Sequence, residues 1–330
     1  MWQLIRPYFR SIYRIASGTI GFFYDIKRFI NYSGWKSNIH DKEERNYLIM
    51  RIYHGLEKSL SYQNRDSNRG WERAFKILAI LKIVNKKNSN EIGFHDKAAK
   101  QILEKFIALP DNQNSKFSSK IKKELKHIDF NSNEQHGAKT HDFKDFTKGI
   151  LENPENFFHS RSSLREFKEE IISPNVIERA IKLAIKTPSV CNRQAWAVYH
   201  TSKKEIKNLI LNYQNGNKPF GPRIPNVMVI ATDLKAFSGG DEHYQHWIDG
   251  GLFSMSLIYA FHSLGIATCP LNWSQIPKND MRLRKKVNIK PNHTIIMFLA
   301  IGYPNNKNKV CFSARRPIDE IILELEKVNK

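Results

Sequence analysis

Apolar residues recur at helical spacing through the first third of the chain. In the segments 42–60, 71–84 and 97–109 they fall three or four positions apart, the period at which side chains share one face of an α-helix. We therefore predict that the chain is all-helical up to about residue 110. A second, polar face of the segment 42–60 either borders a pocket or lies in solvent. Its residues are Arg51, His54, Glu57 and Lys58.

The pattern changes after residue 110. Residues 110–147 are rich in Asn, Ser, Gln and Lys, with one short helix expected at 120–128. Beyond them, predicted helices alternate with predicted strands. We therefore divide the chain into two parts. Residues 1–150 form a helical N-terminal extension with an amphipathic start and a polar linker, and residues 151–330 form a second domain.

Continuous apolar runs dominate the second half. The runs 226–232 and 294–304 are apolar without alternation, which is typical of strands buried on both faces. Segment 250–265 is apolar nearly all round, as a buried helix is, and Gly265 suits its C-terminal cap. The other predicted elements are a helix at 175–186 and a strand at 195–201. This mixture predicts an α+β sandwich in which helices flank a central sheet.

The chain of 330 residues is strongly basic, with 53 Lys and Arg against 32 Asp and Glu and a formal charge of +21. Such a charge attracts nucleic acid, acidic lipid headgroups or phosphorylated ligands, unless it is only a solvated basic surface. The sequence has no helix-turn-helix, zinc-finger or RNA-binding motif, so we expect no nucleic-acid partner. Three widely spaced cysteines fit a reducing, cytoplasmic compartment. We expect no transmembrane helix, because no apolar run is long enough.

The first 35 residues combine apolar and basic residues in a helical pattern. Residues 1–40 hold six bases and one acid. A basic, aromatic, amphipathic helix is typical of a segment that lies in a membrane interface. The alternative is a helix whose apolar side docks on its own protein or on a second subunit, and both interpretations stay open. The apolar stripe is Ile5, Tyr8, Phe9 and Ile12, and the basic stripe is Arg6, Arg10 and Arg14.

Two arginines and two serines stand together in "SRSSLREF", residues 160–167. Guanidinium groups bind phosphate oxygens in a fork, and hydroxyls fill the remaining lone pairs, so this group suits one phosphate. The same composition also occurs in solvated surface loops and phosphorylation sites. The four residues are Arg161, Ser162, Ser163 and Arg165. Near the C-terminus, Arg315 and Arg316 precede a proline and a predicted final helix, and they suit the far side of the same site.

Two more polar segments border predicted core elements. "TPSVCNRQAW", residues 187–196, connects a predicted helix to a predicted strand, and its Arg193 reaches either solvent or an anionic ligand. We expect residues 268–272 to form a loop at the edge of the sheet, where backbone N–H groups meet ligands. Asn272 and Trp273 either face a flat ring there, or Trp273 packs in the core.

Taken in order, these segments resemble the nitroreductase family of FMN-dependent oxidoreductases. The series is SRSSLREF, TPSVCNRQAW, an Asp-Gly before a long apolar helix, Leu-Gly-x-x-Thr, Gly-Tyr-Pro and a late arginine. It covers about residues 157–325 and leaves residues 1–150 unassigned. One departure is Ala195, which stands where the family usually has proline. The implied fold is a nitroreductase-like sandwich with a mixed or antiparallel sheet.

The resemblance implies which residues hold FMN. The arginine-serine opening and Arg315, with Arg316 as the alternate, would hold the phosphate and ribityl chain. Segment 188–192 would lie along the flavin, and the backbone of 269–272 would meet the ring near N5. The full predicted set is Arg161, Ser162, Ser163, Arg165, Pro188, Ser189, Asn192, Cys269, Pro270, Leu271, Asn272 and Arg315.

The resemblance also implies a two-step reaction. NADH or NADPH reduces the flavin and leaves, and a second small molecule then takes the electrons. The cofactor carries this chemistry, so we assign no catalytic side chain. We expect no metal site, because the twelve histidines lack ligand spacing. Family members are usually intertwined homodimers with FMN between the subunits, which would make Asp249–Leu264 a central interface helix.

The fold does not choose the substrate. The family includes quinone and nitroaromatic reductases, reductive dehalogenases and enzymes that oxidise a substrate. Two other functions therefore remain open. One is flavin-dependent dehydrogenation of a biosynthetic substrate. The other is a membrane-surface or interaction protein that uses the flavin fold as a scaffold.

Overall fold

The first part of the chain is a bundle of helices with its own apolar core. The computed structural model describes residues 2–328, and the side chains of residues 2–10 and of Phe146 lie outside the description. The predicted apolar and basic stripes before residue 11 fall among those side chains. Apolar side chains of α2 to α5 form one core, so the predicted helices are confirmed. The helices are α1 (Trp2–Tyr32), α2 (Lys42–Leu60), α3 (Trp71–Val84), α4 (Phe94–Ile107) and α5 (Lys116–Leu125).

Local chemistry explains where α2 begins and how it is fixed to α4. The Asp41 side chain accepts the backbone N–H of Glu44 at 2.8 Å, which caps the first turn of α2. One turn further on, the fully buried Arg45 pairs with Asp96 of α4 at 3.1 Å. Because each buried charge is neutralised by the other, this pair ties the two helices without leaving a free charge in the core.

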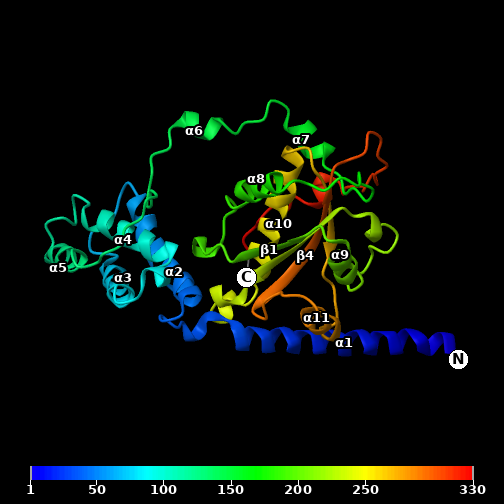
Figure 1. Cartoon of the computed structure of the whole chain (residues 1–330), viewed down its shortest axis with the longest axis horizontal. Coiled ribbons are helices and arrows are strands. Elements are labelled where there is room, and N and C mark those ends of the chain that lie inside the picture. Colours follow the sequence, from blue (N-terminus) through cyan, green and yellow to red (C-terminus); the bar gives the residue numbers. More distant parts are fainter. Residues whose placement is uncertain (1, 329–330) are drawn as a thin grey trace.

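A long connection joins the bundle to the second part. Figure 1 shows this segment arching over the top of the molecule. Its polar composition gives only two short helices, α6 (Phe143–Thr147) and α7 (Pro154–Ser160). The short helix predicted at 120–128 is the overlapping α5, which begins four residues earlier.

The second part is built on a four-stranded antiparallel sheet in the order β1-β2-β4-β3. The predicted α+β fold is confirmed. Every residue of β2 is buried, as its unbroken apolar run predicted. The strands are β1 (Trp196–Thr201), β2 (Asn226–Asp233), β3 (Ala267–Asn272) and β4 (His293–Gly302).

Helices cover both faces of this sheet. Alternate side chains of β2 and β4 point to opposite faces, so each strand contributes to two cores. One core joins Met228 and Leu299 to α8 and α10, and the other joins Val229 and Phe298 to α9 and Leu283 of α11. The helices are α8 (Pro174–Ala184), α9 (Lys204–Leu211), α10 (Gln245–Ser263) and α11 (Pro277–Arg284).

Three expectations need correction. Residues 268–272 are not a loop: they lie in β3, which pairs with β4 along its whole length. The buried helix predicted at 250–265 is α10, which begins five residues earlier and is followed by Gly265 with a φ of 72°. The final helix expected after Pro317 is only a 3-10 turn, Ile318–Glu320, because this segment packs against nothing that would stabilise longer helix.

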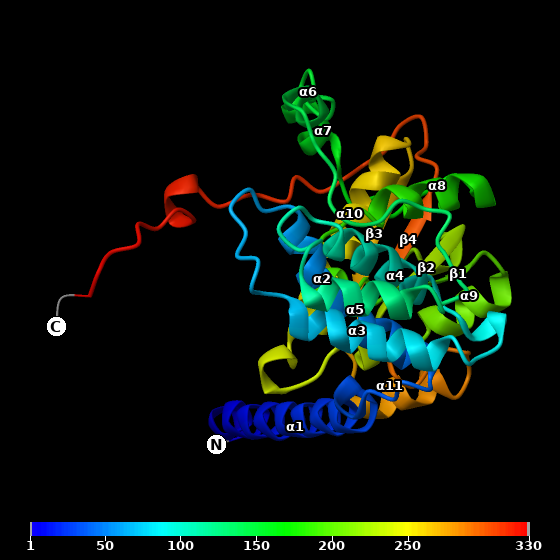
Figure 2. The same cartoon turned by 90° about the vertical axis from the view of Figure 1, so that its left-hand side faces the viewer.

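The chain ends in an extended arm. Every residue from 306 to 328 is exposed, and Figure 2 shows this arm leaving the body of the molecule. The arm carries apolar residues, including Phe312, Leu323 and Leu325. Within residues 2–328, no helix is both long and apolar enough to cross a membrane.

Candidate active site

The arginine-serine segment lies along the free edge of the sheet. Ser163 pairs with Thr268 of β3 in a parallel bridge, and Phe167 pairs with Pro304. The Leu164 N–H donates to the Thr268 carbonyl at 3.0 Å, and the Lys168 N–H donates to the Tyr303 carbonyl at 2.9 Å. The buried side chains of Leu164 and Phe167 hold the segment against the core. Two motifs that are about a hundred residues apart in the sequence are therefore neighbours.

Two positive charges stand at this edge without a carboxylate partner. Among the described residues, neither Arg161 nor Arg165 forms an ion pair; Arg165 Nη1 lies 3.6 Å from Cys311 Sγ. Both arginines act on Cys269 of β3: burial raises the pKa of its thiol, and their charges oppose that rise. Ser162 and Ser163 are half-buried beside them. Two unneutralised guanidiniums and two hydroxyls in one place fit a phosphate group.

The turn between α8 and β1 has an unusual backbone. Cys191, Asn192 and Gln194 have φ angles of 48°, 56° and 50°, all in the left-handed region. Asn tolerates that region, whereas Cys and Gln adopt it at a cost. The Ser189 hydroxyl accepts the Gln194 N–H at 3.0 Å and helps to hold the turn. Such strained positions concentrate where a protein meets a ligand.

Asp249 of α10 fastens the start of this turn. Its carboxylate accepts the Val190 N–H at 3.3 Å and the Gln245 side-chain amide at 2.8 Å. Burial raises the pKa of Asp249, and these two hydrogen bonds oppose the rise. The Asp-Gly step lies within the first turns of α10 and places a hydrogen-bond acceptor beside the predicted flavin segment. Pro188 and Asn192 remain exposed there.

Arg193 reaches neither solvent nor a free anion, the two outcomes left open by the sequence. It is buried and forms an ion pair with Glu242, and it also donates to the Ala236 carbonyl. The glutamate comes from a loop 49 residues later, and no local pattern in the sequence connects the two.

The four predicted residues of β3 alternate, as strand geometry requires. Cys269 and Leu271 are buried, whereas Pro270 and Asn272 are exposed. The Asn272 carbonyl accepts the Gln214 side-chain amide at 3.1 Å. Trp273 stacks on Phe298 with centroids 4.8 Å apart and donates its indole N–H to Asp280. Trp273 is therefore a packing residue and not a free platform for a ring.

Arg315 is not brought to this group within one chain. It lies on the exposed arm, where its guanidinium donates to the Ser313 carbonyl. Arg316 lies beside it, also exposed. The predicted site residues thus fall into two clusters at opposite edges of the sheet, the arginine-serine segment beside β3 and the α8–β1 turn beside β1, and one separate residue on the arm.

The N-terminal extension covers part of the α8–β1 turn. Tyr47 of α2 donates its hydroxyl to Asp233 at 3.2 Å, and Arg51 donates to the Ser238 hydroxyl at 2.7 Å. Tyr47 and Val190 pack against one small apolar cluster. Of the polar face predicted on this helix, Arg51 makes this contact, and His54 pairs with Glu57 at 3.1 Å.

A cavity of about 400 Å³ lies at this junction. It is bordered by residues of α2, of the strained turn and of the ends of β2 and β4, including Tyr47, Gln194, Asp233 and His293. Tyr199 and His293 are 2.8 Å apart at Oη and Nδ1. Contacts between segments this distant in sequence leave no pattern among neighbouring residues, so sequence analysis did not predict this cavity.

Known proteins resemble the second half of the chain. Residues 159–215 match the model of the Nitroreductase family. Iodotyrosine deiodinase 1 of Sus scrofa is 24% identical over 196 residues, which are 50% of this chain and 66% of that protein. Iodotyrosine deiodinase of Nematostella vectensis is 25% identical over 192 residues, 49% of this chain and 71% of that one. The matched region thus spans about two thirds of these relatives.

Solved structures match the same half. A nitroreductase with bound FMN from Desulfitobacterium hafniense is 20% identical, with a TM-score of 0.42, over 54% of this chain and 100% of that chain. A nitroreductase family protein from Streptococcus pneumoniae is 18% identical, with a TM-score of 0.44, over 52% of this chain and 98% of that chain. The family match over residues 159–215 and the order of the motifs support the nitroreductase family for the second half of this chain.

Proposed function

We propose that the protein is an FMN-dependent oxidoreductase that takes electrons from NADH or NADPH and passes them to a small-molecule acceptor. The observation that supports this most is the placement of Arg161 and Arg165 at the β3 edge, free of carboxylate partners in the described part of the chain. A bound FMN would supply the hydride and electron transfer in both half-reactions.

This chain's own residues would bind and orient that group. Arg161, Ser162, Ser163 and Arg165 would hold the phosphate. The strained turn with Pro188, Ser189 and Asn192 lies at the opposite edge of the sheet, so in a homodimer it would lie along the ring held by the partner subunit, and Asp249 would hold that turn in place. The exposed edge at Pro270 and Asn272 would border the ring on the other side. Positive charge nearby would stabilise a reduced, anionic flavin.

We also propose a homodimer formed through α10. Apolar side chains follow one outward stripe of this helix at helical spacing, which is where a subunit interface would lie. They are Tyr244, Ile248, Leu252 and Met255, with Trp247 beside them. In such a dimer the exposed arm of one subunit can reach the other, and Arg315 would then complete the partner's phosphate site. We also propose a cytoplasmic location, because three widely spaced cysteines fit a reducing compartment.

The proposed cofactor site is tested with two flavins. FMN carries the phosphate and riboflavin lacks it. The full-length protein should purify yellow or take up FMN with a shift in the flavin absorption bands. Arg161→Ala and Arg165→Ala should each weaken FMN binding by about 1.5–3 kcal/mol, the range for a hydrogen bond to a charged group. Their riboflavin affinity should stay unchanged, and Arg179→Ala on the exposed side of α8 is the matched control.

Two results would contradict the cofactor site. One is a wild-type protein that does not bind FMN. The other is a pair of arginine variants that lose FMN and riboflavin affinity equally, because that would place the arginines away from the phosphate. A separate stopped-flow measurement of flavin reduction by NADH and by NADPH would identify the electron donor of the FMN-bound protein.

A second candidate reaction is reductive dehalogenation. It is supported by the iodotyrosine deiodinases among the relatives of the second half. Two electrons and a proton would replace the halogen on an aromatic ring, and the halogen would leave as halide ion. Reoxidation of the reduced protein by iodotyrosine, by a nitroaromatic compound and by a quinone separates these acceptors. Deiodination is favoured if iodotyrosine is the only acceptor that reoxidises the protein and iodide is released. Deiodination is excluded if only the quinone or the nitro compound reoxidises the protein.

A dehydrogenase that oxidises a biosynthetic substrate is the third alternative. It predicts that the substrate, and not NADH or NADPH, reduces the flavin. A membrane contact through residues 1–35 is a separate proposal, because it depends on α1 and not on the flavin site.

A further inference from the structure

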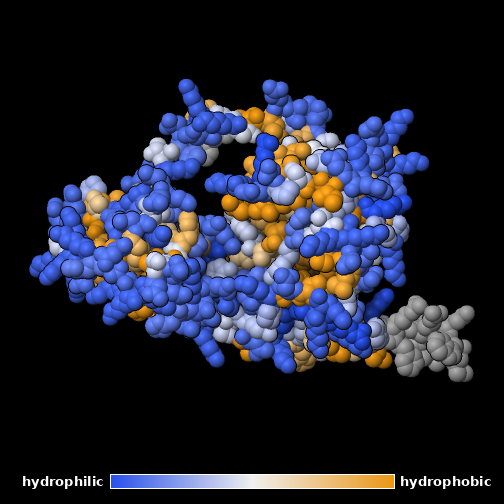
Figure 3. Space-filling model, in the orientation of Figure 1, coloured by the Kyte–Doolittle hydropathy of each residue, from blue (hydrophilic) through white to orange (hydrophobic). Residues whose placement is uncertain are grey.

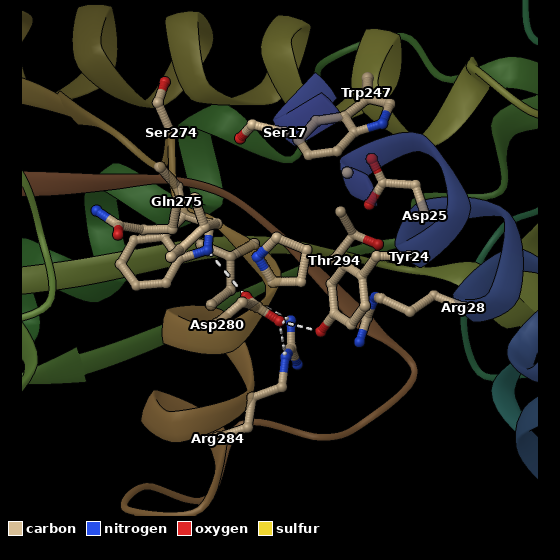
Figure 4. A pocket seen from close by; sticks show the side chains of 15 residues that line it. Ser17, Tyr24, Asp25, Arg28, Trp247, Ser274, Gln275, Asp280, Arg284 and Thr294 are labelled. Atoms are coloured by element: carbon tan, nitrogen blue, oxygen red, sulfur yellow. Dashed lines mark hydrogen bonds and ion pairs between the residues drawn. The ribbon is translucent and has the colours of Figure 1, made fainter. Parts of the chain in front are cut away.

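Helix α1 turns its polar side toward its own protein and its apolar side outward. Ser17, Gly21, Tyr24 and Arg28 recur at helical spacing and line a cavity of about 360 Å³ against α11 and the sheet (Figure 4). On the opposite side, a row of large apolar side chains is more than half exposed. These residues are Ile12, Ile15, Ile20, Phe22, Phe23, Ile26 and Ile30. A helix that packs on its own core would be turned the other way.

Specific polar contacts fix this orientation. The buried Asp280 carboxylate of α11 accepts the Tyr24 hydroxyl at 2.6 Å, and it also accepts Nε of Arg284 at 2.7 Å. Arg28 is only 8% exposed and donates to the His293 carbonyl at 3.0 Å. Figure 4 shows these side chains converging on the cavity from α1 and α11.

Rotation of α1 about its axis would bury the apolar row, but it would break these bonds and leave Asp280 and Arg28 short of partners. Burial, followed by the hydrogen bond to Asp280, raises the pKa of Tyr24 to about 12, so its hydroxyl remains a donor at neutral pH. The outward direction of the apolar row is therefore set by a built network and does not result from loose attachment.

The apolar row is surrounded by positive charge. Segments 11–36 and 274–288 together contain nine Lys and Arg against two acids. One of the acids is Asp280, which is already neutralised by Arg284. Figure 2 shows α1 and α11 along the same lower edge of the molecule, and Figure 3 shows apolar side chains along that edge. We call this surface the α1–α11 face. Its exposed bases are Arg14, Lys27, Lys36, Lys278, Arg282, Lys285 and Lys286.

The positive charge of this face favours one kind of partner over another. A second copy docked through the same face would bring two strongly positive surfaces together, at an electrostatic cost. A bilayer with anionic headgroups offers the opposite charge and an apolar interior to the same face. The straight row from Ile12 to Ile30 extends over about 27 Å at 1.5 Å per residue, and its whole length can meet a flat surface at once.

We propose that the α1–α11 face docks the protein on an anionic lipid bilayer, with α1 lying in the interface plane. Phe22, Phe23 and Ile26 enter the boundary between headgroups and acyl chains, and the surrounding bases contact the headgroups. The proposal goes beyond the flavin chemistry and does not depend on it. It places the oxidoreductase domain at the membrane surface, where apolar acceptors concentrate.

Vesicle co-sedimentation of the full chain tests the proposal. The vesicles are phosphatidylcholine alone and phosphatidylcholine with phosphatidylglycerol. We expect binding to the anionic vesicles, little to the neutral ones, and weaker binding as salt rises. The double variant Phe23→Ser/Ile26→Ser should bind about tenfold more weakly, because two apolar side chains no longer leave water. Its matched control is Phe143→Ser/Ile150→Ser, which removes an even more exposed Phe and Ile from the connecting segment.

A second pair of variants tests the charge. Lys278→Gln/Arg282→Gln on α11 should weaken binding about tenfold or more, since each base near an anionic surface contributes about 1 kcal/mol. Lys122→Gln/Lys123→Gln on the distant α5 removes the same charge and should bind as the wild type does. Circular dichroism checks that every variant is folded, and FMN binding reports separately on the flavin site.

Three outcomes would overturn the proposal. The first is a wild-type chain that does not sediment with anionic vesicles. The second is equal binding by the α1 variant and its control. The third combines two results: the wild type does not bind vesicles, and light scattering shows that Phe23→Ser/Ile26→Ser has a lower oligomer mass than the wild type. That combination would assign the face to a second copy of the chain.

Discussion

The buried Arg193 forms an ion pair with the partly buried Glu242, with Nη1 and Oε2 3.0 Å apart, beneath the turn that connects α8 to β1. The same carboxylate accepts the backbone N–H of Ser238 at 2.7 Å. Arg193 also donates Nε to the Val190 carbonyl at 3.2 Å, so one side chain ties the turn to the loop before α10. The strained backbone of residues 191–194 is therefore held from below by a charged network and from the side by Asp249.

Removal of one member of this pair should destabilise the protein. Arg193→Ala leaves the Glu242 carboxylate without its partner, and we expect a loss of about 3–5 kcal/mol in the free energy of unfolding. Urea unfolding followed by circular dichroism measures it. Arg179→Ala removes an exposed arginine from α8 and should leave stability within about 0.5 kcal/mol. An Arg193→Ala protein as stable as the wild type would show that the pair does not hold the turn.

Mixed dimers can locate Arg315. If Arg161 of one subunit and Arg315 of its partner serve one phosphate, Arg161→Ala and Arg315→Ala should each weaken FMN binding in the homodimer. A dimer of one Arg161→Ala and one Arg315→Ala subunit would then contain one site with both arginines and one site with neither. Titration of differently tagged, co-purified subunits should show wild-type affinity in half of the sites. No recovery would mean that the two arginines do not meet across the interface.

The outward stripe of α10 should govern assembly. Ile248→Asp and Leu252→Asp place charges in an apolar interface, so we expect either change to shift the protein from dimer to monomer. Sedimentation velocity measures this mass. Ile206→Asp alters a comparably exposed residue on α9 and serves as the control. A wild-type protein that is monomeric at all concentrations would contradict the proposed homodimer.

His246 of α10 stacks on Phe29 of α1 with ring centroids 6.3 Å apart, and acid should destabilise the protein through this histidine. Burial, followed by the charges of Arg28 and His243, lowers the pKa of His246 to about 4. In the unfolded chain this histidine takes a proton near pH 6.5, so the unfolded state binds more protons as the pH falls. Stability should therefore decrease by about 2 kcal/mol between about pH 7 and pH 5.

The variant His246→Gln has no group that titrates there, so its unfolding free energy should change less over the same pH range. His159→Gln alters an exposed histidine of α7 and should keep the wild-type pH dependence. Urea unfolding at each pH makes the comparison. Parallel curves for the wild type and His246→Gln would show that another group causes the loss.

The sequence by itself determined the elements whose periodicity is strong. α2 and α3 begin and end where their apolar spacing predicted, and β2 is buried at every position of its apolar run. The order of the polar motifs indicated the family. These features are local, because spacing, capping residues and motif order act over a few neighbouring positions.

Only the tertiary structure decided the rest. Residues 268–272 look like a loop by composition, with a proline and an asparagine, but pairing with β4 makes them part of a strand. The same sheet edge brings Arg161 and Arg165 to Cys269, and a distant loop supplies the carboxylate for Arg193. The amphipathic pattern of α1 could not say which side faces outward. That side is fixed by Asp280, 256 residues after Tyr24, because a charge buried in the fold requires its hydrogen-bond partners wherever the chain brings them.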